Sequence, residues 1–233
     1  MHNVVSFSGG KDSTAMLLLM LENQMPIDEV VFCDTDMEFP QMYDHISLVE
    51  KKTGIQVTRL KQEKSFEYWA TEHLKKNGNV GYWWPNMMNR WCTSYFKSNA
   101  FKKYTKQKYG KDVVKYVGIA LDEPKRIKND GSKYPLYEYG ITEAAALKMC
   151  YERGYHWNGL YETFQRVSCY CCPLQRIGEA RSLYRNYPDL YQRILDIEKK
   201  TMALAGDKGR WKLTVSAKDL ATRFEKELLE ADK

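Results

Sequence analysis

The fold is decided by one stretch near the start of the chain, Val4-Val5-Ser6-Phe7-Ser8-Gly9-Gly10-Lys11-Asp12-Ser13. Its first four residues have the β-branched and aromatic character of a strand. Two glycines then permit backbone conformations that a side chain forbids, so that successive N–H groups can point at one anion. A helix follows directly and adds the positive end of its dipole. Strand, glycine loop and helix together predict a phosphate-binding turn.

The side chains of this turn support the same prediction. Lys11 brings a full positive charge, and Ser8 and Ser13 bring hydroxyl donors. Asp12 fits beside phosphates if it holds Mg²⁺ or caps the helix. The order of residues is neither that of the common phosphate loop nor that of the three-glycine dinucleotide fingerprint. The turn therefore indicates a nucleotide site of another kind.

Strand and helix signals alternate after the turn. We expect strands at 4–7, 29–33, 55–60 and 113–119, and helices at 13–23 and 41–53. This alternation predicts an α/β fold with a mostly parallel, twisted sheet and helices on both faces. Ligands of such sheets bind at the carboxyl ends of the strands, where Ser8–Ser13, Asp34–Asp36 and the segment after Ile119 would converge.

The later part of the chain reads as helical. Apolar periodicity predicts helices at 142–153, 178–186, 189–205 and 217–231. The stretch 80–92, which is rich in Trp, Asn and Met, has no clean period. We expect a nucleotide-binding domain over 1–175 that carries a group of cysteines, and a helical extension over 176–233 packed on it.

Composition narrows the partners. The chain has 233 residues, is 43% hydrophobic and carries a net charge of +6, which suits a globular protein with an anionic partner such as a nucleotide or a nucleic acid. No apolar run approaches the roughly 20 residues of a membrane span. The first residues enter a strand without a signal-peptide pattern, so we expect a cytoplasmic protein whose cysteines are not in disulfides.

A basic run leads into the fourth predicted strand. Lys102, Lys103, Lys106, Lys108, Lys111 and Lys115 have Tyr104 and Tyr109 interleaved. The run is typical of a solvated helix face, and a nucleic-acid contact surface is the alternative.

The loop Ser8–Ser13 resembles the signature of the ATP pyrophosphatases, also called adenine nucleotide α-hydrolases. Further segments resemble the phosphoadenylyl-sulfate (PAPS) reductase branch of that superfamily: Cys33–Pro40, Gly118–Arg126, Pro135–Glu143 and Arg166–Pro173. Within the first of these, Asp36 stands where the branch has glycine. The resemblance extends over about residues 3–175 and implies the adenine nucleotide α-hydrolase-like fold.

The resemblance also implies a nucleotide site. The substrate would be ATP, accompanied by Mg²⁺, or adenylyl sulfate. Lys11 and Asp12 would be catalytic. The implied nucleotide-binding residues are Ser6, Ser8, Gly9, Gly10, Lys11, Asp12, Ser13, Asp34, Thr35, Gly118 and Arg126.

Three of the six cysteines cluster in Cys169-Tyr170-Cys171-Cys172-Pro173. By spacing alone, thiolates on such a turn suit zinc or an iron–sulfur cluster equally well. The adenylyl-sulfate reductases hold a [4Fe–4S] cluster with a Cys-Cys and a Cys-x-x-Cys pair, and here Trp91 replaces the first Cys. The resemblance therefore implies Cys92, Cys169 and Cys172 as ligands, with Cys171 as a candidate fourth. Cys33 and Cys150 read as packing residues.

Three functions follow from these patterns. A reductase of the branch uses a mobile cysteine near its carboxyl terminus, and here no cysteine follows Cys172. The first expectation is therefore an ATP pyrophosphatase or sulfurtransferase that adenylates an acceptor, with nucleic acid as one candidate, and then transfers sulfur. The alternatives are a PAPS or adenylyl-sulfate reductase and a non-catalytic nucleotide- or nucleic-acid-binding protein.

Overall fold

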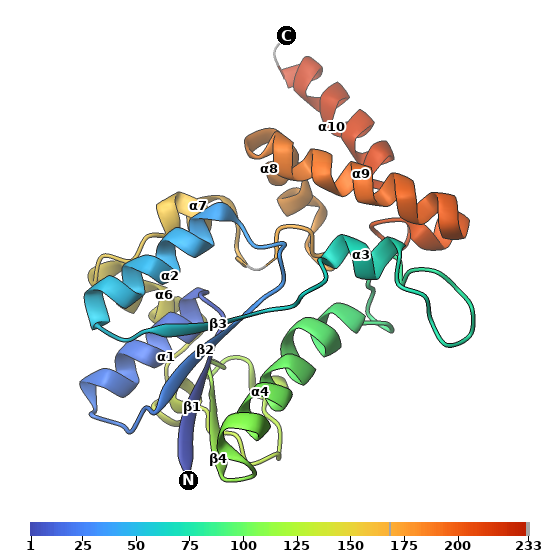
Figure 1. The fold of residues 1–233 in the computed structure, drawn as a ribbon. Coiled ribbons are helices and arrows are strands. Elements are labelled where there is room, and N and C mark those ends of the chain that lie inside the picture. Colours follow the sequence, from blue (N-terminus) through green and yellow to red (C-terminus); the bar gives the residue numbers. More distant parts are fainter. Residues whose placement is uncertain (168, 232–233) are drawn as a thin grey trace. The chain divides into compact units, whose positions relative to one another are not determined.

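The computed structural model describes residues 1–167 and 169–231. Within them one parallel sheet is formed, in the order β3-β2-β1-β4 (Figure 1), by β1 (His2–Phe7), β2 (Glu29–Asp34), β3 (Val57–Lys61) and β4 (Val113–Val117). In the sheet Val5 lies opposite Val30 on one side and Tyr116 on the other. The strand order reverses between β1 and β4, because β2 and β3 follow on one side of β1 and β4 on the other. Ligands of open α/β sheets bind at such a switch point.

Helices cover both faces of the sheet, as the sequence predicts. The helices α1 (Lys11–Glu22) and α2 (Pro40–Thr53) connect strands that are added in one direction, so right-handed crossovers place both on one face. α4 (Asn99–Tyr109) leads into β4 on the opposite side of β1 and covers the other face (Figure 1). There Phe101 packs in a buried cluster with Val4 and Val31. The predicted α/β fold class is confirmed.

The helices of the later part are also close to their predicted positions. They are α6 (Glu143–Glu152), α8 (Ile177–Asn186), α9 (Pro188–Ala205) and α10 (Ala217–Ala231). Shorter pieces connect them and the strands: α3 (Phe66–Thr71), a π-helical turn at Thr93–Ser98, α5 (Pro135–Glu138), α7 (Leu160–Thr163), and 3₁₀ turns at Pro124–Arg126, Trp157–Gly159 and Gly206–Gly209. None of the described helices is long and apolar enough to cross a bilayer.

Two strands are each two residues shorter at one end than predicted. The fourth strand ends at Val117, two residues before the expected Ile119, because the Ile119 amide turns back to donate to the Val117 carbonyl at 3.0 Å. The third strand begins at Val57 because Gly54, with φ of 72°, ends α2 and the Ile55 amide donates to the Thr53 hydroxyl. In both cases a local hydrogen bond replaces a rung of the sheet.

The chain forms two compact units that interleave along the sequence. The first comprises 1–34, 38–61 and 96–161, and the second comprises 35–37, 62–95 and 162–233. In the second unit α9 packs against α3 and α8, with Tyr191, Ile194 and Trp211 buried. The carboxyl-terminal helices thus share a core with residues 62–95. The boundary expected at residue 175 stays a prediction.

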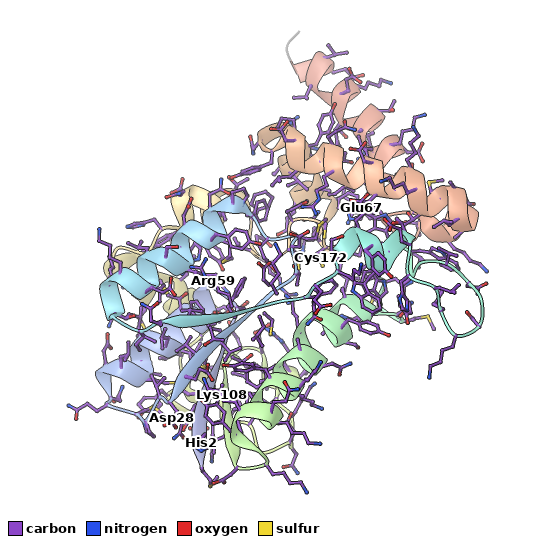
Figure 2. The ribbon with its side chains drawn as sticks, in the orientation of Figure 1. His2, Asp28, Arg59, Glu67, Lys108 and Cys172 are labelled. Carbon is purple, nitrogen blue, oxygen red and sulfur yellow. The ribbon has the colours of Figure 1, made fainter. Side chains whose placement is uncertain are left out.

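The tyrosines of the basic run anchor α4 to the sheet. Tyr104, Tyr109 and Lys108 all donate to the carboxylate of Glu29 on β2, at 2.6, 2.9 and 2.9 Å. Lys108 lies at the amino end of the sheet, near His2 and Asp28 (Figure 2). Of the remaining lysines, those at 102, 103, 106 and 111 are exposed, and Lys115 of β4 is half-buried. Part of the run is therefore structural, and its contact with nucleic acid stays a prediction.

Candidate functional site

The glycine loop folds over the first turn of α1. The Ser8 amide donates to the Ser13 hydroxyl at 3.1 Å, and that hydroxyl lies 3.0 Å from the Gly10 carbonyl oxygen, to which it donates. Gly9 has φ of 75°, and a Cβ built there would lie 2.4 Å from the sulfur of Met42. Glycine suits this position, because side chains rarely adopt its backbone conformation and any side chain would force Met42 to move.

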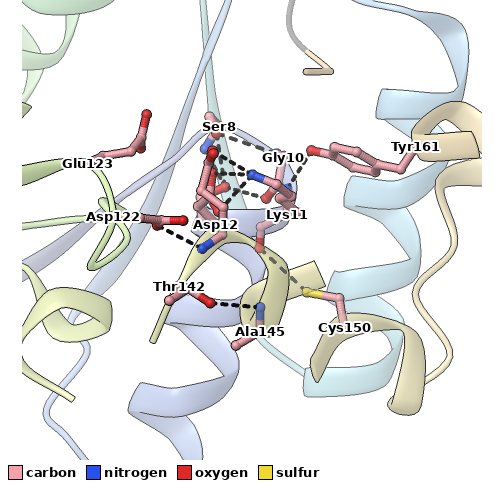
Figure 3. Close-up of polar contacts among 12 residues, drawn as sticks. Ser8, Gly10, Lys11, Asp12, Asp122, Glu123, Thr142, Ala145, Cys150 and Tyr161 are labelled. Carbon is pink, nitrogen blue, oxygen red and sulfur yellow. Dashed lines mark hydrogen bonds and ion pairs between the residues drawn. The ribbon is translucent and has the colours of Figure 1, made fainter. Parts of the chain in front are cut away.

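Two aromatic residues from a distant segment brace the loop. The Trp157 indole N–H donates to the Gly9 carbonyl at 2.7 Å. The Tyr161 hydroxyl accepts the Lys11 amide at 2.7 Å (Figure 3). Trp157 and Asn158 both have left-handed backbones, with φ of 47° and 48°. Strain of this kind persists only where the surrounding structure fixes it, and it gathers at functional sites.

Behind the loop, Trp157 stacks on a buried histidine. The ring centroids of Trp157 and His45 are 4.2 Å apart, and His45 Nε2 lies 2.9 Å from the hydroxyl of Thr14 in α1. Burial lowers the pKa of His45 to about 3, so the imidazole is neutral at physiological pH. The support of the loop is therefore an uncharged aromatic stack.

Lys11 lies between two carboxylates. Its Nζ is 3.1 Å from Asp12 Oδ1 and 2.8 Å from Glu143 Oε1. Glu143 is placed by the start of α6, where its amide donates to Asp122 and the Thr142 hydroxyl accepts the Ala145 amide (Figure 3). Burial alone would lower the pKa of Lys11, but the attraction of Asp12 and Glu143 outweighs it and raises the pKa. The lysine is therefore fully charged.

Asp12, Glu123 and Glu143 form a carboxylate trio. One carboxylate oxygen of each lies within 4.8 Å of the other two. Among the described residues, no other three His, Cys, Asp or Glu side chains bring their ligand atoms this close together. Burial raises the pKa of Asp12, an effect that Lys11 opposes and the two glutamates reinforce. Three carboxylates against two cations, Lys11 and the Arg126 that pairs with Glu123, leave an excess of negative charge. Hard oxygen ligands are those that Mg²⁺ prefers. The trio fits a divalent cation.

Other predicted nucleotide residues lie on the same unit. Ser6 is a half-buried residue of β1, and Asp34 ends β2 and accepts a hydrogen bond from Tyr43 at 2.8 Å. Gly118 follows β4, and a Cβ there would lie 2.8 Å from the Asp12 carbonyl group, so β4 closely approaches α1. Arg126 forms an ion pair with Glu123. The structure therefore brings together the Ser8–Ser13 loop, Gly118 and the Glu123–Arg126 ion pair.

The segment after β2 belongs to the second unit. Thr35 is buried there, and Asp36 has φ of 64°. Arg193 of α9 donates to the Asp36 carbonyl at 3.0 Å and to its carboxylate at 2.9 Å. Asp36 stands where the PAPS reductase branch has glycine. A glycine would adopt this left-handed backbone conformation without steric cost. Arg193 holds the aspartate in that conformation.

All four proposed cysteine ligands lie in the second unit. The Cys172 amide donates to the Cys169 carbonyl at 3.1 Å, which closes a turn, and Cys171 within it is buried. Cys92, Cys169 and Cys172 are half-buried, and Figure 2 labels the last of them. Among the described residues, three cysteine sulfurs do not come within 4.8 Å of one another. A zinc ion would hold the sulfurs of its thiolate ligands about 3.8 Å apart. A cluster binds each thiolate through a different iron, so its sulfurs can lie farther apart. Both centres stay predictions.

The two remaining cysteines behave as packing residues. The thiol of Cys150 in α6 donates to the Lys11 carbonyl at 3.5 Å, and burial raises its pKa to about 12. Burial raises the pKa of Cys33 to about 11. Both thiols are therefore protonated and unreactive at neutral pH. Ser168, which precedes Cys169 in the Arg166–Pro173 segment, lies outside the described residues.

The fold and the glycine loop are those of the adenine nucleotide α-hydrolase-like class. The model of the phosphoadenosine phosphosulfate reductase domain matches residues 2–175, and the chain belongs to that family.

Relatives support the family without adding an activity. The chain is 30% identical over 210 residues to an uncharacterised protein of Methanocaldococcus jannaschii, covering 82% of this chain and 40% of the relative. It is 31% identical over 148 residues to an uncharacterised nin region protein of Escherichia phage lambda, covering 55% and 51%. The chain thus spans about half the length of the curated relatives it matches. The crystal structure of a PAPS reductase from Candida auris, a phosphate complex, is similar with a TM-score of 0.50 and 17% identity over 72% of this chain and 82% of that one, which shows the fold.

Proposed function

We propose that this protein is an ATP pyrophosphatase of the sulfurtransferase kind. An acceptor oxygen would attack the α-phosphorus of ATP, the bond to the β-phosphate oxygen would break, and pyrophosphate would leave. A sulfur nucleophile would then displace AMP from the adenylated acceptor. A nucleic acid is one acceptor that suits the net charge of +6.

The observation that carries this proposal is the carboxylate trio beside Lys11. ATP releases pyrophosphate, whose charge a divalent cation neutralises. Adenylyl sulfate has no pyrophosphate to release, and a thiol that reduces its sulfur needs no such cation. Asp12, Glu123 and Glu143 would hold Mg²⁺, which supplies charge neutralisation on the leaving group when bound. The trio therefore favours ATP over the sulfonucleotide.

The roles of the remaining residues follow from their positions. The Ser8–Ser13 loop and the amino end of α1 would bind the phosphates. When ATP binds, Lys11 would leave one of its carboxylate partners and pair with a phosphate oxygen instead. Its charge would then stabilise the negative charge that develops on that phosphate. Trp157 and Tyr161 keep the loop in its binding shape. Ser6, Asp34, Thr35, Gly118 and Arg126 remain proposed contacts of the nucleotide.

The cysteines would serve the sulfur half of the reaction. We place an iron–sulfur cluster on Cys92, Cys169 and Cys172, with Cys171 as the proposed fourth ligand and zinc as the alternative. A cluster would supply sulfur-carrying and redox chemistry when bound. The support is that three of these cysteines are half-buried in one compact unit, unlike the deeply buried Cys150.

The test measures ATP binding and pyrophosphate release by anaerobically purified protein, with Mg²⁺ and either tRNA or DNA as acceptor. Lys11→Ala should weaken ATP binding about 10- to 100-fold, the value of a charge-assisted hydrogen bond, and abolish release. Lys51→Ala, which removes an exposed lysine of α2 outside the basic run, is the matched control and should behave like the unchanged protein.

Each other outcome points elsewhere. Unchanged ATP binding by Lys11→Ala would refute the assignment of the loop. Thioredoxin-dependent release of sulfite from adenylyl sulfate would make the protein a reductase. Binding of ATP without turnover, whichever acceptor is offered, would leave a nucleotide-binding protein. Iron content and absorbance near 400 nm separate a cluster from zinc, which has no visible absorbance.

A further inference from the structure

A segment outside the family match contacts the proposed cysteine site. The matched residues end at 175, whereas Trp211 and Lys212 lie in the turn between α9 and α10. The Trp211 indole N–H donates to the Cys171 carbonyl at 2.7 Å. The Lys212 ammonium donates to the Pro173 and Gln175 carbonyls at 3.0 and 2.7 Å. Three carbonyls of the cysteine loop are therefore held by two neighbouring side chains.

This segment is itself firmly seated on α9. The Glu198 carboxylate is buried and accepts the amides of Trp211 and Ala217 at 2.7 and 2.8 Å. The Thr201 hydroxyl donates to the Gly209 carbonyl at 2.6 Å, and a Cβ at Gly209 would lie 2.3 Å from the Thr201 carbonyl oxygen. The two donors are therefore presented by a rigid support.

The charge of Lys212 is the second observation. Its side chain is 7% exposed, and among the described residues no carboxylate forms an ion pair with it. A buried cation is costly unless an anion lies near. Burial lowers the pKa of Lys212 to about 8, and the attraction of Cys172 and Glu179 opposes this effect. A thiolate-ligated metal centre on this loop would add negative charge beside the two carbonyls that already accept from the ammonium.

We infer that Trp211 and Lys212 are positioning residues of the cysteine site: they fix the backbone of residues 169–175, and Lys212 balances the charge of the centre that the thiolates hold. The inference rests on the cysteine site of the proposed function. It gives the carboxyl-terminal helices a role, because α9 and α10 carry the donors that the loop requires.

The test is hydrogen exchange of three loop amides in anaerobically purified protein. The Tyr170, Cys172 and Gln175 amides donate to the carbonyls of Met37, Cys169 and Cys172 and report the order of the loop. Trp211→Phe and Lys212→Met should each speed their exchange about tenfold, because one buried donor is lost. Lys208→Met removes an exposed lysine of the same segment and should leave exchange unchanged.

A second measurement reports the charge. If iron is present, Lys212→Met should shift the midpoint potential of the centre to a more negative value, because a nearby positive charge is lost, and Lys212→Arg should restore it. Trp211→Phe keeps an aromatic ring in the core and removes only the N–H donor. Its amide exchange therefore tests the positioning role even if Lys212→Met does not fold.

Unchanged exchange of the three amides in folded Trp211→Phe and Lys212→Met would overturn the inference. This result is independent of the proposed activity, because exchange needs neither iron nor turnover. Protein that contains no iron would count against the proposed cofactor alone. Faster exchange with an unchanged potential would overturn the charge-balancing role and leave the positioning role standing.

Discussion

At position 36 the backbone adopts a conformation that costs an ordinary side chain about 1–2 kcal/mol relative to glycine. Asp36 accepts this cost with φ of 64°, and two hydrogen bonds from Arg193 offset it. The family's glycine and this chain's Asp36–Arg193 pair are therefore two solutions to one backbone requirement.

A pair of substitutions tests this equivalence. Asp36→Gly should change the free energy of unfolding by less than about 1 kcal/mol, because the loss of the carboxylate is compensated by the relief of strain. Asp36→Ala should cost about 1–2 kcal/mol more than Asp36→Gly, because alanine keeps the strain and loses the bond. Urea unfolding measures both. Equal stability of the two variants would show that the left-handed backbone imposes no cost here.

At the same scale, the sequence indicated the phosphate loop but not its supports. Ser8–Ser13 could be recognised because glycines, lysine and helix start are adjacent in the chain. Trp157 and Tyr161 contact the loop from about 150 positions away, and nothing in their local pattern marks them. Glu123 and Glu143 entered the prediction only as parts of matched segments, because spacing does not reveal that three carboxylates meet.

At the scale of elements, the end of β4 packs closely against the first turn of α1, beside the switch point of the sheet. A Cβ at Gly118 would lie 2.8 Å from the Asp12 carbonyl and 2.9 Å from the Ser13 Cα, and these are backbone atoms that cannot swing aside. Gly118→Ala should therefore destabilise the protein by about 1–3 kcal/mol, as overpacking does, and weaken ATP binding. Thermal unfolding and ATP titration are the measurements.

Gly178→Ala is the matched control, because no atom lies within 4 Å of a Cβ at this exposed residue of α8. It should be neutral or stabilise by up to about 1 kcal/mol, since alanine is the better helix former. If Gly118→Ala leaves stability and ATP affinity unchanged, the strand end and the helix are less tightly packed than the structure indicates.

The elements differ in how well the sequence predicted them. α1 and β2 are apolar runs that bury nearly every residue, so the run alone identifies them. The stretch 80–92 has no period because stacked rings order this region: Tyr82 lies 5.3 Å from His73 and 5.8 Å from Trp91 between centroids. Contacts between rings that are nine positions apart follow neither the helical nor the strand repeat.

For the whole molecule, the main consequence is that the family match and the compact units divide the chain differently. The match ends at residue 175, but residues 62–95 pack with 162–233 in one unit. Lys200 of α9 pairs with Glu67 of α3 at 2.6 Å, and α9 buries Ile194 and Ile197 in the same core. A sequence-based boundary follows the resemblance, whereas the core is built from segments that the resemblance does not link.

A truncation tests which division governs folding. If the second unit needs its carboxyl-terminal helices, residues 1–175 alone should lose ordered structure over 62–95, because burial of α9 and α10 against this region is lost. The first unit should stay folded, since its sheet and helices come from 1–61 and 96–161. Limited proteolysis with mass spectrometry should show early cleavage within 62–95 and protection elsewhere in 1–161. Addition of a separate 176–233 fragment should restore protection. Cooperative unfolding of 1–175 at the temperature of the full chain would instead support a self-sufficient domain that ends at 175, with the helices as an appended extension.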